Sequence, residues 1–273
     1  MHAIQKKPKQ PEFTGPFPFE ISMPDSVYPL STGHQREEIR RTMRPMRIGH
    51  NLLIVLTLAF LSSPGISSAE TRSDIQGWSA VLQTRRITDS ERPVSLWLDT
   101  HARRSESNTL FIVRPGIGWA PLSWLSVWAG YGWIPTDADN GGVNHEHRFW
   151  QQLVLKHKTD NGFAFQARTR LEERLSEGGD DVGLRVREFL RASWQPDVSI
   201  PIGVAVWDEL FVSFNDTDWG QRSGFDQNRL FIGPMLPVHP NFRIEMGYLF
   251  LYANREPDNR IGHVFATNLF VTM

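Results

Sequence analysis

The sequence predicts an all-β protein, an antiparallel up-and-down transmembrane β-barrel, and three observations predict it. After residue 70, apolar and polar residues alternate with period two in short runs, as in strands with one buried face. Clusters rich in Gly, Asn, Asp and Pro separate these runs. No segment after residue 70 has the apolar periodicity of a helix, so no helix is expected to cover the apolar face of such a sheet. The sheet is therefore expected to close on itself.

The overall composition agrees with this class and excludes others. The chain has 29 Lys and Arg against 30 Asp and Glu, so a nucleic-acid partner is not expected. A hydrophobic content of 40% and a mean hydropathy of −0.35 are too low for a bundle of transmembrane helices. A barrel remains compatible, because only alternate residues of its strands face lipid. Without cysteine, the chain has no disulfides and no thiolate metal site.

The N-terminal part is predicted to direct export. Residues 1–43 are rich in Pro and carry no periodic pattern, which indicates a disordered extension or a mis-assigned start. Residues 44–69 have the order of a signal peptide: a positive flank, the short apolar run Leu52–Leu61, a helix breaker and small residues. Cleavage is expected after Ala69. The remainder, 70–273, is the expected barrel domain, located in the outer membrane of a Gram-negative cell.

Turn signals divide the region after residue 70 into candidate strands, with short turns alternating with longer polar loops as in outer-membrane barrels. The candidate strands are 75–84, 93–104, 109–119, 123–134, 145–158, 162–176, 183–195, 200–214, 225–236, 241–253 and 262–272. Single-chain bacterial barrels almost always have an even number of strands. We therefore expect ten or twelve, with twelve slightly preferred.

The charges are expected on the inner face of the barrel. In the run 163–175, Phe163 and Leu171 share one face, whereas Arg170 and Glu172 lie on the other. Because Arg or Lys at a bilayer midplane costs about 2–4 kcal/mol, the charged face should line the lumen. The charged residues expected there are Asp99, Arg103, Glu146, Arg148, Arg168, Arg170, Glu172, Arg174, Arg185, Arg187, Arg191, Glu209, Arg229 and Glu245.

Two roles suit this charge ladder. Cross-strand ion pairs can satisfy each other and hold the register of the strands, which is a structural role. A charged constriction can instead select solutes. The expected partners are outer-membrane lipid and a small polar or anionic solute. Aromatic residues form membrane-interface girdles where they face lipid; the candidates are Trp97, Trp119, Trp124, Trp128, Trp133, Trp150, Trp194, Tyr248 and Tyr252.

Catalytic and metal-binding motifs are sparse. His145 and His147 share one strand face, which can suit a metal, but no third ligand is evident, and no cofactor or metal is expected. No nucleophile motif such as G-x-S-x-G occurs, so no catalytic residue is assigned. Gly116, Gly118 and Gly130 are interpreted as isolated strand or turn glycines.

Several motifs resemble the DUF2490 family of uncharacterised, signal-bearing bacterial proteins. They comprise Trp78, Arg114–Gly118, Ala129–Tyr131, Glu146–Gln152, Arg168–Arg174, Leu184–Arg187, Trp207–Phe211, Gln227–Leu230, Glu245–Tyr248 and His263. Asp99 departs from the pattern, which has Glu there. The resemblance implies an outer-membrane-type barrel and no particular reaction.

Three functional hypotheses therefore stand beside one another. The first is an outer-membrane barrel with a narrow charged lumen, either structural or a small-solute pore. The second is an outer-membrane lipid-modifying hydrolase. The third is a periplasmic, lipocalin-like barrel that binds an apolar ligand, with aliphatic side chains inside and arginines outside.

Overall fold

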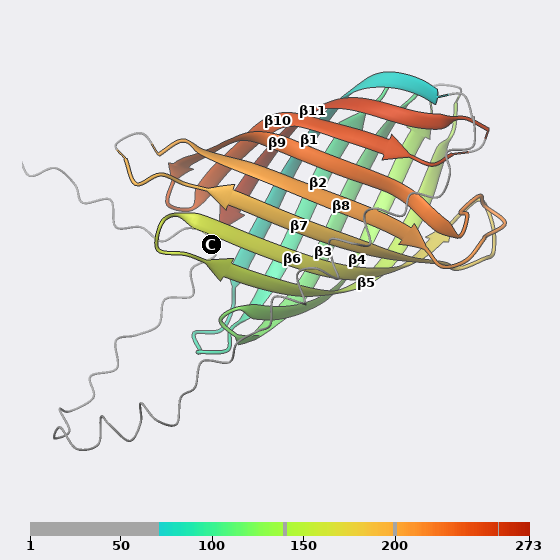
Figure 1. Ribbon diagram of the computed structural model, residues 1–273. Helices are drawn as coiled ribbons and strands as arrows, with labels where there is room; N and C mark the ends of the chain where they lie inside the picture. Colours follow the sequence, from blue (N-terminus) through green and yellow to red (C-terminus); the bar gives the residue numbers. More distant parts are fainter. Residues whose placement is uncertain (1–70, 139–140, 199–200, 256) are drawn as a thin grey trace, which may run out of the picture. The chain divides into compact units, whose positions relative to one another are not determined.

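The computed structural model describes residues 71–138, 141–198, 201–255 and 257–273. In this part of the chain, eleven strands form one closed barrel (Figure 1). The strands are β1 (Thr71–Arg86), β2 (Val94–Arg104), β3 (Asn108–Leu122), β4 (Leu125–Ala138), β5 (Val143–Lys158), β6 (Phe163–Ser176), β7 (Gly183–Trp194), β8 (Gly203–Ser213), β9 (Gly224–His239), β10 (Phe242–Ala253) and β11 (Asn259–Thr272). The all-β barrel class expected from the alternating pattern is confirmed.

The expected strand number of ten or twelve is wrong for the described residues. Each strand pairs antiparallel with the next one along the chain, and β1 then pairs in parallel with β11 to close the barrel. This closing pair runs without interruption from Thr71↔Asn259 to Thr84↔Thr272. A parallel pair satisfies the backbone groups of both edges as an antiparallel pair does, so an odd number of strands can close.

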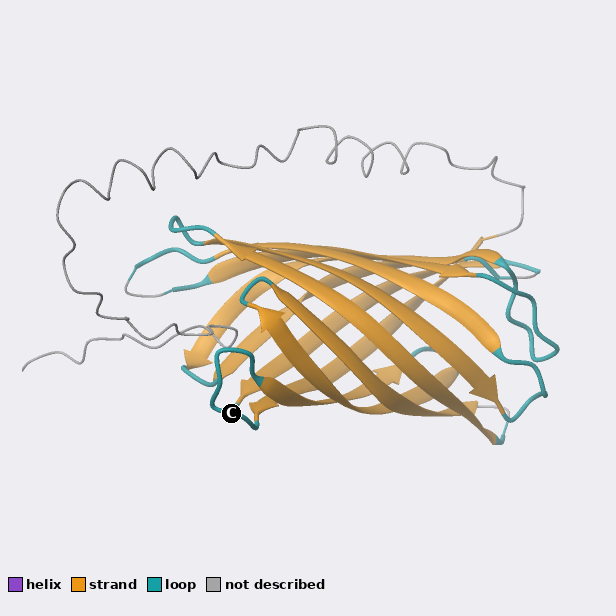
Figure 2. Cartoon of the chain, turned by 90° about the horizontal axis from the view of Figure 1, so that it is seen from below, coloured by secondary structure: helices purple, strands orange, loops and turns teal. Residues whose placement is uncertain are grey.

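The predicted extension 1–43, the signal peptide 44–69 and its cleavage after Ala69 lie outside the described residues. Among the described residues, no helix is long and apolar enough to cross a membrane. The strands run at a slant to the barrel axis, as Figure 2 shows.

Both ends of the barrel carry short and longer connections, so the expected alternation of short turns with longer loops is only partly present. The short connections 123–124, 159–162 and 240–241 lie at the end that also holds Met273, which we call the C-terminal end, together with the longer connections 87–93 and 195–202. The opposite end, which we call the loop end, carries the longer connections 177–182 and 214–223. Because the number of strands is odd, β1 begins at the loop end while β11 finishes at the C-terminal end.

Several hydrogen bonds hold the two longest connections of the loop end together, and the Asp218 carboxylate accepts two of them. The side chain of Asp218 accepts hydrogen bonds from the backbone N–H of Asp180, at 2.8 Å, and of Asp181, at 3.2 Å. Trp219 donates its indole N–H to the carbonyl of Asp181, at 2.7 Å. These bonds clasp the β6–β7 connection to the β8–β9 connection.

Two glycines make room for a tryptophan inside the barrel. Gly116 on β3 and Gly130 on β4 lie directly opposite each other. A Cβ atom at Gly130 would lie 2.4 Å from the Trp150 ring and 2.3 Å from the carbonyl oxygen of Pro115, and one at Gly116 would lie 2.6 Å from the same ring. The interpretation of these glycines as strand residues is confirmed, but they are not isolated, because together they form the surface on which the indole packs.

The barrel interior contains one apolar cluster beside its charged residues. On β8 to β11, buried apolar residues form one cluster, against which Trp78 and Trp207 pack: Ala205, Phe231, Leu249, Leu251, Val264 and Ala266. Trp207 stacks on Phe231, with ring centroids 5.2 Å apart. Buried charged residues lie on these strands as well, for example Glu209 on β8, Arg229 on β9 and Glu245 on β10.

Candidate functional site: the charged interior of the barrel

The structure places the side chains of all fourteen ladder residues on the inner face of the barrel, buried or nearly so. They alternate with outward-facing apolar residues because successive side chains of a strand point to opposite faces. Inside the barrel they form ion pairs that connect strands from β2 to β10.

Glu172 on β6 is the first centre of this network and is fully buried. One of its carboxylate oxygens lies 2.6 Å from Arg185, and the other lies 2.7 Å from Arg187. Arg114 and Arg170 approach the same carboxylate at 3.8 Å. One carboxylate therefore faces four guanidinium groups, drawn from three strands.

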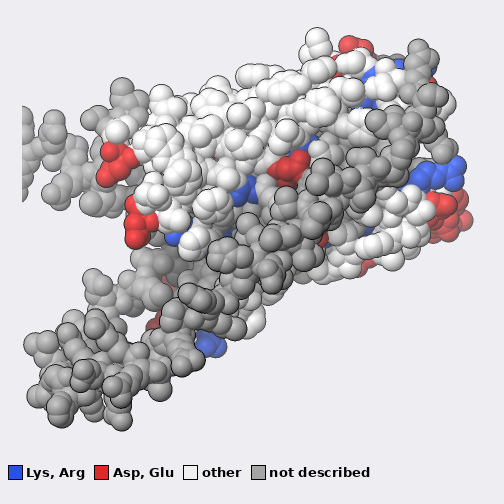
Figure 3. Space-filling view, viewed as in Figure 1, with Lys and Arg blue, Asp and Glu red and all other residues white. Residues whose placement is uncertain are grey.

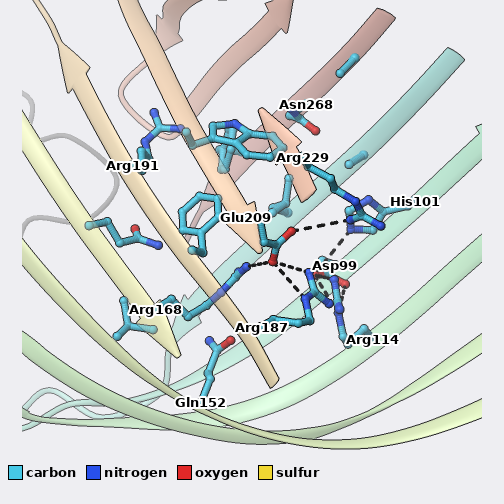
Figure 4. A pocket seen from close by; sticks show the side chains of 18 of the residues that line it. Asp99, His101, Arg114, Gln152, Arg168, Arg187, Arg191, Glu209, Arg229 and Asn268 are labelled. Atoms are coloured by element: carbon cyan, nitrogen blue, oxygen red, sulfur yellow. Dashed lines mark hydrogen bonds and ion pairs between the residues drawn. The ribbon is translucent and has the colours of Figure 1, made fainter. Parts of the chain in front are cut away.

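Glu209 on β8 is the second centre (Figure 4). It accepts hydrogen bonds from Arg168 and, at 2.6 Å, from Arg187, and Arg229 lies 3.7 Å away. Arg168 belongs to β6, so its side chain reaches past β7 to meet this carboxylate. Arg187 touches both Glu172 and Glu209 and joins the two centres.

Several buried partners were not on the list of ladder residues expected from sequence. Arg114 on β3 binds Asp99 on β2 through two nitrogens, at 2.9 and 2.8 Å, and His101 lies 3.6 Å from the same carboxylate. Arg243 pairs with Glu245 at 3.0 Å. Asp226 pairs with Arg185 at 2.8 Å. The period-two pattern could have predicted the inward position of Arg114, because Arg114 lies on the same face of β3 as Ile112 and Gly116.

Side chains close the middle of the barrel. Arg170 stacks on the buried Trp150 at 4.6 Å and donates two hydrogen bonds to Gln152, at 2.9 and 2.6 Å. Arg185 and Arg187 lie over the Phe211 ring at 5.1 and 4.6 Å. We call this set, together with Glu172, the closed layer.

Cavities lie on both sides of the closed layer. A cavity of about 150 Å³ lies toward the C-terminal end, and one of about 990 Å³ lies at the loop end. Among the described residues, the two share no lining residue, and Trp150, Arg170 and Glu172 of the closed layer occupy the strand positions between them.

Cations outnumber anions inside the described part of the barrel. Eleven arginines have inward side chains: Arg103, Arg114, Arg148, Arg168, Arg170, Arg174, Arg185, Arg187, Arg191, Arg229 and Arg243. Six carboxylates face them: Asp99, Glu146, Glu172, Asp226, Glu209 and Glu245. Each of these carboxylates except Asp99 contacts two or more arginines, and Asp99 contacts Arg114 and lies 3.6 Å from His101.

The outer face carries the histidine pair and part of the aromatic set. Tyr131 hydrogen-bonds His147, and Trp133 donates to His145 at 3.2 Å. In the described residues, no group of three His, Cys, Asp or Glu side chains is placed to hold a metal ion. Of the tryptophans considered for membrane-interface girdles, Trp119, Trp124, Trp133 and Trp194 are exposed, but Trp97, Trp128 and Trp150 lie inside the barrel.

Comparisons with other proteins agree with the motifs. An uncharacterised protein of Methylorubrum extorquens is 32% identical over 229 residues, covering 82% of this chain and 99% of its own length. No solved structure matches the chain. The family described as "Protein of unknown function (DUF2490)" matches residues 75–262, which is more than half of the chain. The chain therefore belongs to the DUF2490 family.

Proposed function

We propose that the protein is an outer-membrane β-barrel whose narrow, charge-lined lumen is closed at its middle. The observation that carries this proposal is the outward apolar surface, which extends around the whole barrel. Each of the eleven strands exposes at least one large apolar side chain: Ile75, Leu96, Phe111, Val127, Phe149, Phe165, Leu190, Val206, Ile232, Tyr248 and Phe265. Soluble monomers rarely expose an apolar surface that extends so far.

The distribution of aromatic side chains supports a membrane location. Near the C-terminal end, exposed aromatic residues occupy the ends of β3, β6, β7 and β10 and the β3–β4 turn: Trp119, Phe163, Trp194, Phe242 and Trp124. Rings at this level suit the boundary between lipid and water. Figure 3 shows charged residues mainly toward the two ends of the visible wall, with a few between them.

Three outward carboxylates interrupt the apolar wall. Glu173 accepts a hydrogen bond from Gln151 at 3.3 Å, and Glu188 accepts one from Thr169 at 2.8 Å. Asp208 accepts two bonds from Asn228, both at 3.0 Å. Carboxylates on the lipid face of a barrel cost less than lysine or arginine, and each of these has a neighbouring donor on the next strand.

The apolar and charged side chains face the opposite way from those expected in the lipocalin-like alternative. A carrier of apolar ligands needs an apolar cavity and a water-facing exterior, whereas this barrel has buried arginines and an apolar exterior. Within the membrane proposal, the ion-pair network ties the strands together, and it has to rearrange before a solute can pass the closed layer.

Fractionation of cells that express the full chain tests this proposal. We expect the protein in the outer-membrane fraction, extracted only with detergent, with a gel mobility that changes on boiling because a folded barrel migrates differently from the unfolded chain. Release as a soluble protein by osmotic shock would overturn the membrane location. In planar bilayers, the purified wild-type protein should show little or no steady conductance.

A further inference from the structure

The cavity of about 150 Å³ lies next to the closed layer, toward the C-terminal end (Figure 4). Arginines from several strands line it, among them Arg103, Arg168 and Arg229. The rest of its wall consists of aromatic, aliphatic and polar side chains and includes the carboxylates Asp99 and Glu209. At roughly 30 Å³ per water molecule, it has room for about five waters or for one small molecule.

Buried donors without a hydrogen-bond partner line this cavity. Within the described part of the chain, they include Nε of Arg103, Arg168 and Arg229 and the indole Nε1 of Trp97. A buried N–H without an acceptor costs about 1–3 kcal/mol, and more on a charged group. Four such donors around one cavity indicate an acceptor that is charged and carries several oxygen atoms.

The local charge balance indicates the same ligand. Arg103 has no carboxylate within ion-pair distance among the described residues, and its Nη2 lies only 3.5 Å from Nδ1 of His101. The nearest carboxylate of Arg229 is Glu209, at 3.7 Å, which Arg168 and Arg187 already share. An anion in the cavity would supply the negative counter-charge that these two guanidinium groups lack.

Aromatic rings hold the arginines in place. Arg103 and Arg229 both lie over the ring system of Trp78, at 4.0 and 5.0 Å, and Arg168 lies over Phe189 at 4.5 Å. A stacked guanidinium keeps its N–H groups available in its own plane, where carboxylate and phosphate oxygens bind. The site is therefore already organised for an oxyanion.

A second cavity lies nearer the C-terminal end. It has a volume of about 460 Å³ and is lined by turn residues, including Ser123 and Gly162. The two cavities share the lining residues Lys156, Gln166, Arg191 and Arg243, so they adjoin. A route from the C-terminal end to these arginines would therefore not cross the closed layer.

We propose that this cavity is a binding site for a small oxyanion, a carboxylate or a phosphate group, held by Arg103, Arg229 and Arg168. Its role as a solute site of an outer-membrane barrel rests on the proposed function, but the binding itself does not. The indole of Trp97 adds a neutral donor beside the guanidinium groups. The aromatic part of the wall also suits an apolar body no larger than a benzene ring, a size that a cavity of about 150 Å³ accommodates.

Titration of the full chain in detergent with sodium phosphate, acetate or benzoate, at constant ionic strength set with chloride, tests the site. Trp78 and Trp97 line the cavity, so their fluorescence reports occupancy. We expect a saturable change with at least one of the three anions. Preference for phosphate would identify a tetrahedral anion, and preference for benzoate over acetate would identify an organic carboxylate that uses the aromatic part of the wall.

Matched variants separate a built site from general attraction of anions. Arg103→Gln and Arg229→Gln should each weaken binding about tenfold or more, the scale of one charge-assisted hydrogen bond. Arg104→Gln removes the same charge from the adjacent, outward-facing residue and should leave the affinity unchanged. Arg103→Lys keeps the positive charge but loses the planar set of N–H donors of the guanidinium group. It should therefore weaken binding less than Arg103→Gln.

Two results would overturn the site: no saturable change with any of the three anions on the folded wild-type barrel, or equal weakening by Arg103→Gln and Arg104→Gln. If the glutamine variants fail to fold, the wild-type titration and Arg103→Lys still decide. An outer-membrane protein that binds none of the anions overturns this inference alone. A soluble periplasmic protein that binds one overturns the membrane location and keeps the site.

Discussion

Arg191 on β7 and Glu245 on β10 form a two-pronged ion pair inside the barrel, with nitrogen–oxygen distances of 2.8 and 2.6 Å. The strands β8 and β9 separate them in the wall, so the pair is a chord across the interior rather than a rung between neighbouring strands. Such a chord resists flattening of the barrel in a way that cross-strand pairs do not.

A double-mutant cycle on this chord should show strong coupling. Arg191→Gln and Glu245→Gln should each lower the free energy of unfolding, and their coupling energy should be about 1–3 kcal/mol because they share one buried contact. Urea unfolding of the detergent-refolded protein measures it. Combining Arg191→Gln with Glu106→Gln, in the β2–β3 connection, should be additive; a comparable coupling for that pair would contradict the assignment.

Neutralising Glu172 should be far more costly than neutralising its neighbour. Glu172→Gln leaves Arg185 and Arg187 without the carboxylate that both contact. Removing one partner of a buried ion pair costs about 3–5 kcal/mol. Glu173→Gln removes the same charge from the outward face and should change stability by about 0.5 kcal/mol or less. The temperature at which the heat-dependent gel shift occurs compares the two, and equal shifts would refute a central role for Glu172.

Truncating Trp150 should open the closed layer. The indole is fully buried against Arg170 and above Gly116 and Gly130, so Trp150→Ala removes much of the side-chain volume at the middle of the barrel. We expect a measurable single-channel conductance in planar bilayers, together with a loss of stability of about 3–5 kcal/mol. Phe149→Ala, on the outer face, should leave the conductance at the wild-type level. Unchanged conductance in a folded Trp150→Ala barrel would show that other side chains keep it shut.

Because the number of strands is odd, the start of β1 and the end of β11 are expected on opposite sides of the membrane. The chain has no cysteine, so single introduced cysteines report cleanly. In sealed proteoliposomes, Thr71→Cys should react with an impermeant maleimide from the same side as Ser107→Cys. Met273→Cys should react from the same side as Asn161→Cys. Labelling of Thr71→Cys and Met273→Cys from one side would indicate an even-stranded barrel instead.

The clasp between the two long connections should weaken in acid. Backbone hydrogen bonds from Asp180 and Asp181 hold the pKa of Asp218 below its ordinary value of 3.8. A lowered pKa in the folded state stabilises the clasp above pH 3.8, and this contribution is lost as the pH falls through the folded value. At pH 7, Asp218→Ala should speed amide hydrogen exchange in residues 177–182, whereas Asp160→Ala should not. Equal exchange rates in both variants would contradict the clasp.

The sequence by itself determined where the strands lie and what each face of a strand carries. The run 163–175 shows why: Phe163 and Leu171 fall on one face and Arg170 and Glu172 on the other because side chains alternate along any extended chain. The alternation of side chains is a property of one strand, so it can be predicted without knowing which strands pair. It also separates Glu172 from Glu173 and Arg103 from Arg104, which the matched variants exploit.

Only the tertiary structure decided how the sheet closes and which charges meet. The parallel pairing of β1 with β11 joins the first and last strands of the barrel, and no local pattern specifies it. Arg191 and Glu245 are 54 residues apart, and the partners of Glu172 come from three strands. Such contacts depend on the diameter of the closed barrel and on the tilt of its strands, which emerge only when all the strands have paired. The surface that Gly116 and Gly130 form beneath Trp150 has the same origin, because it joins three strands across the wall.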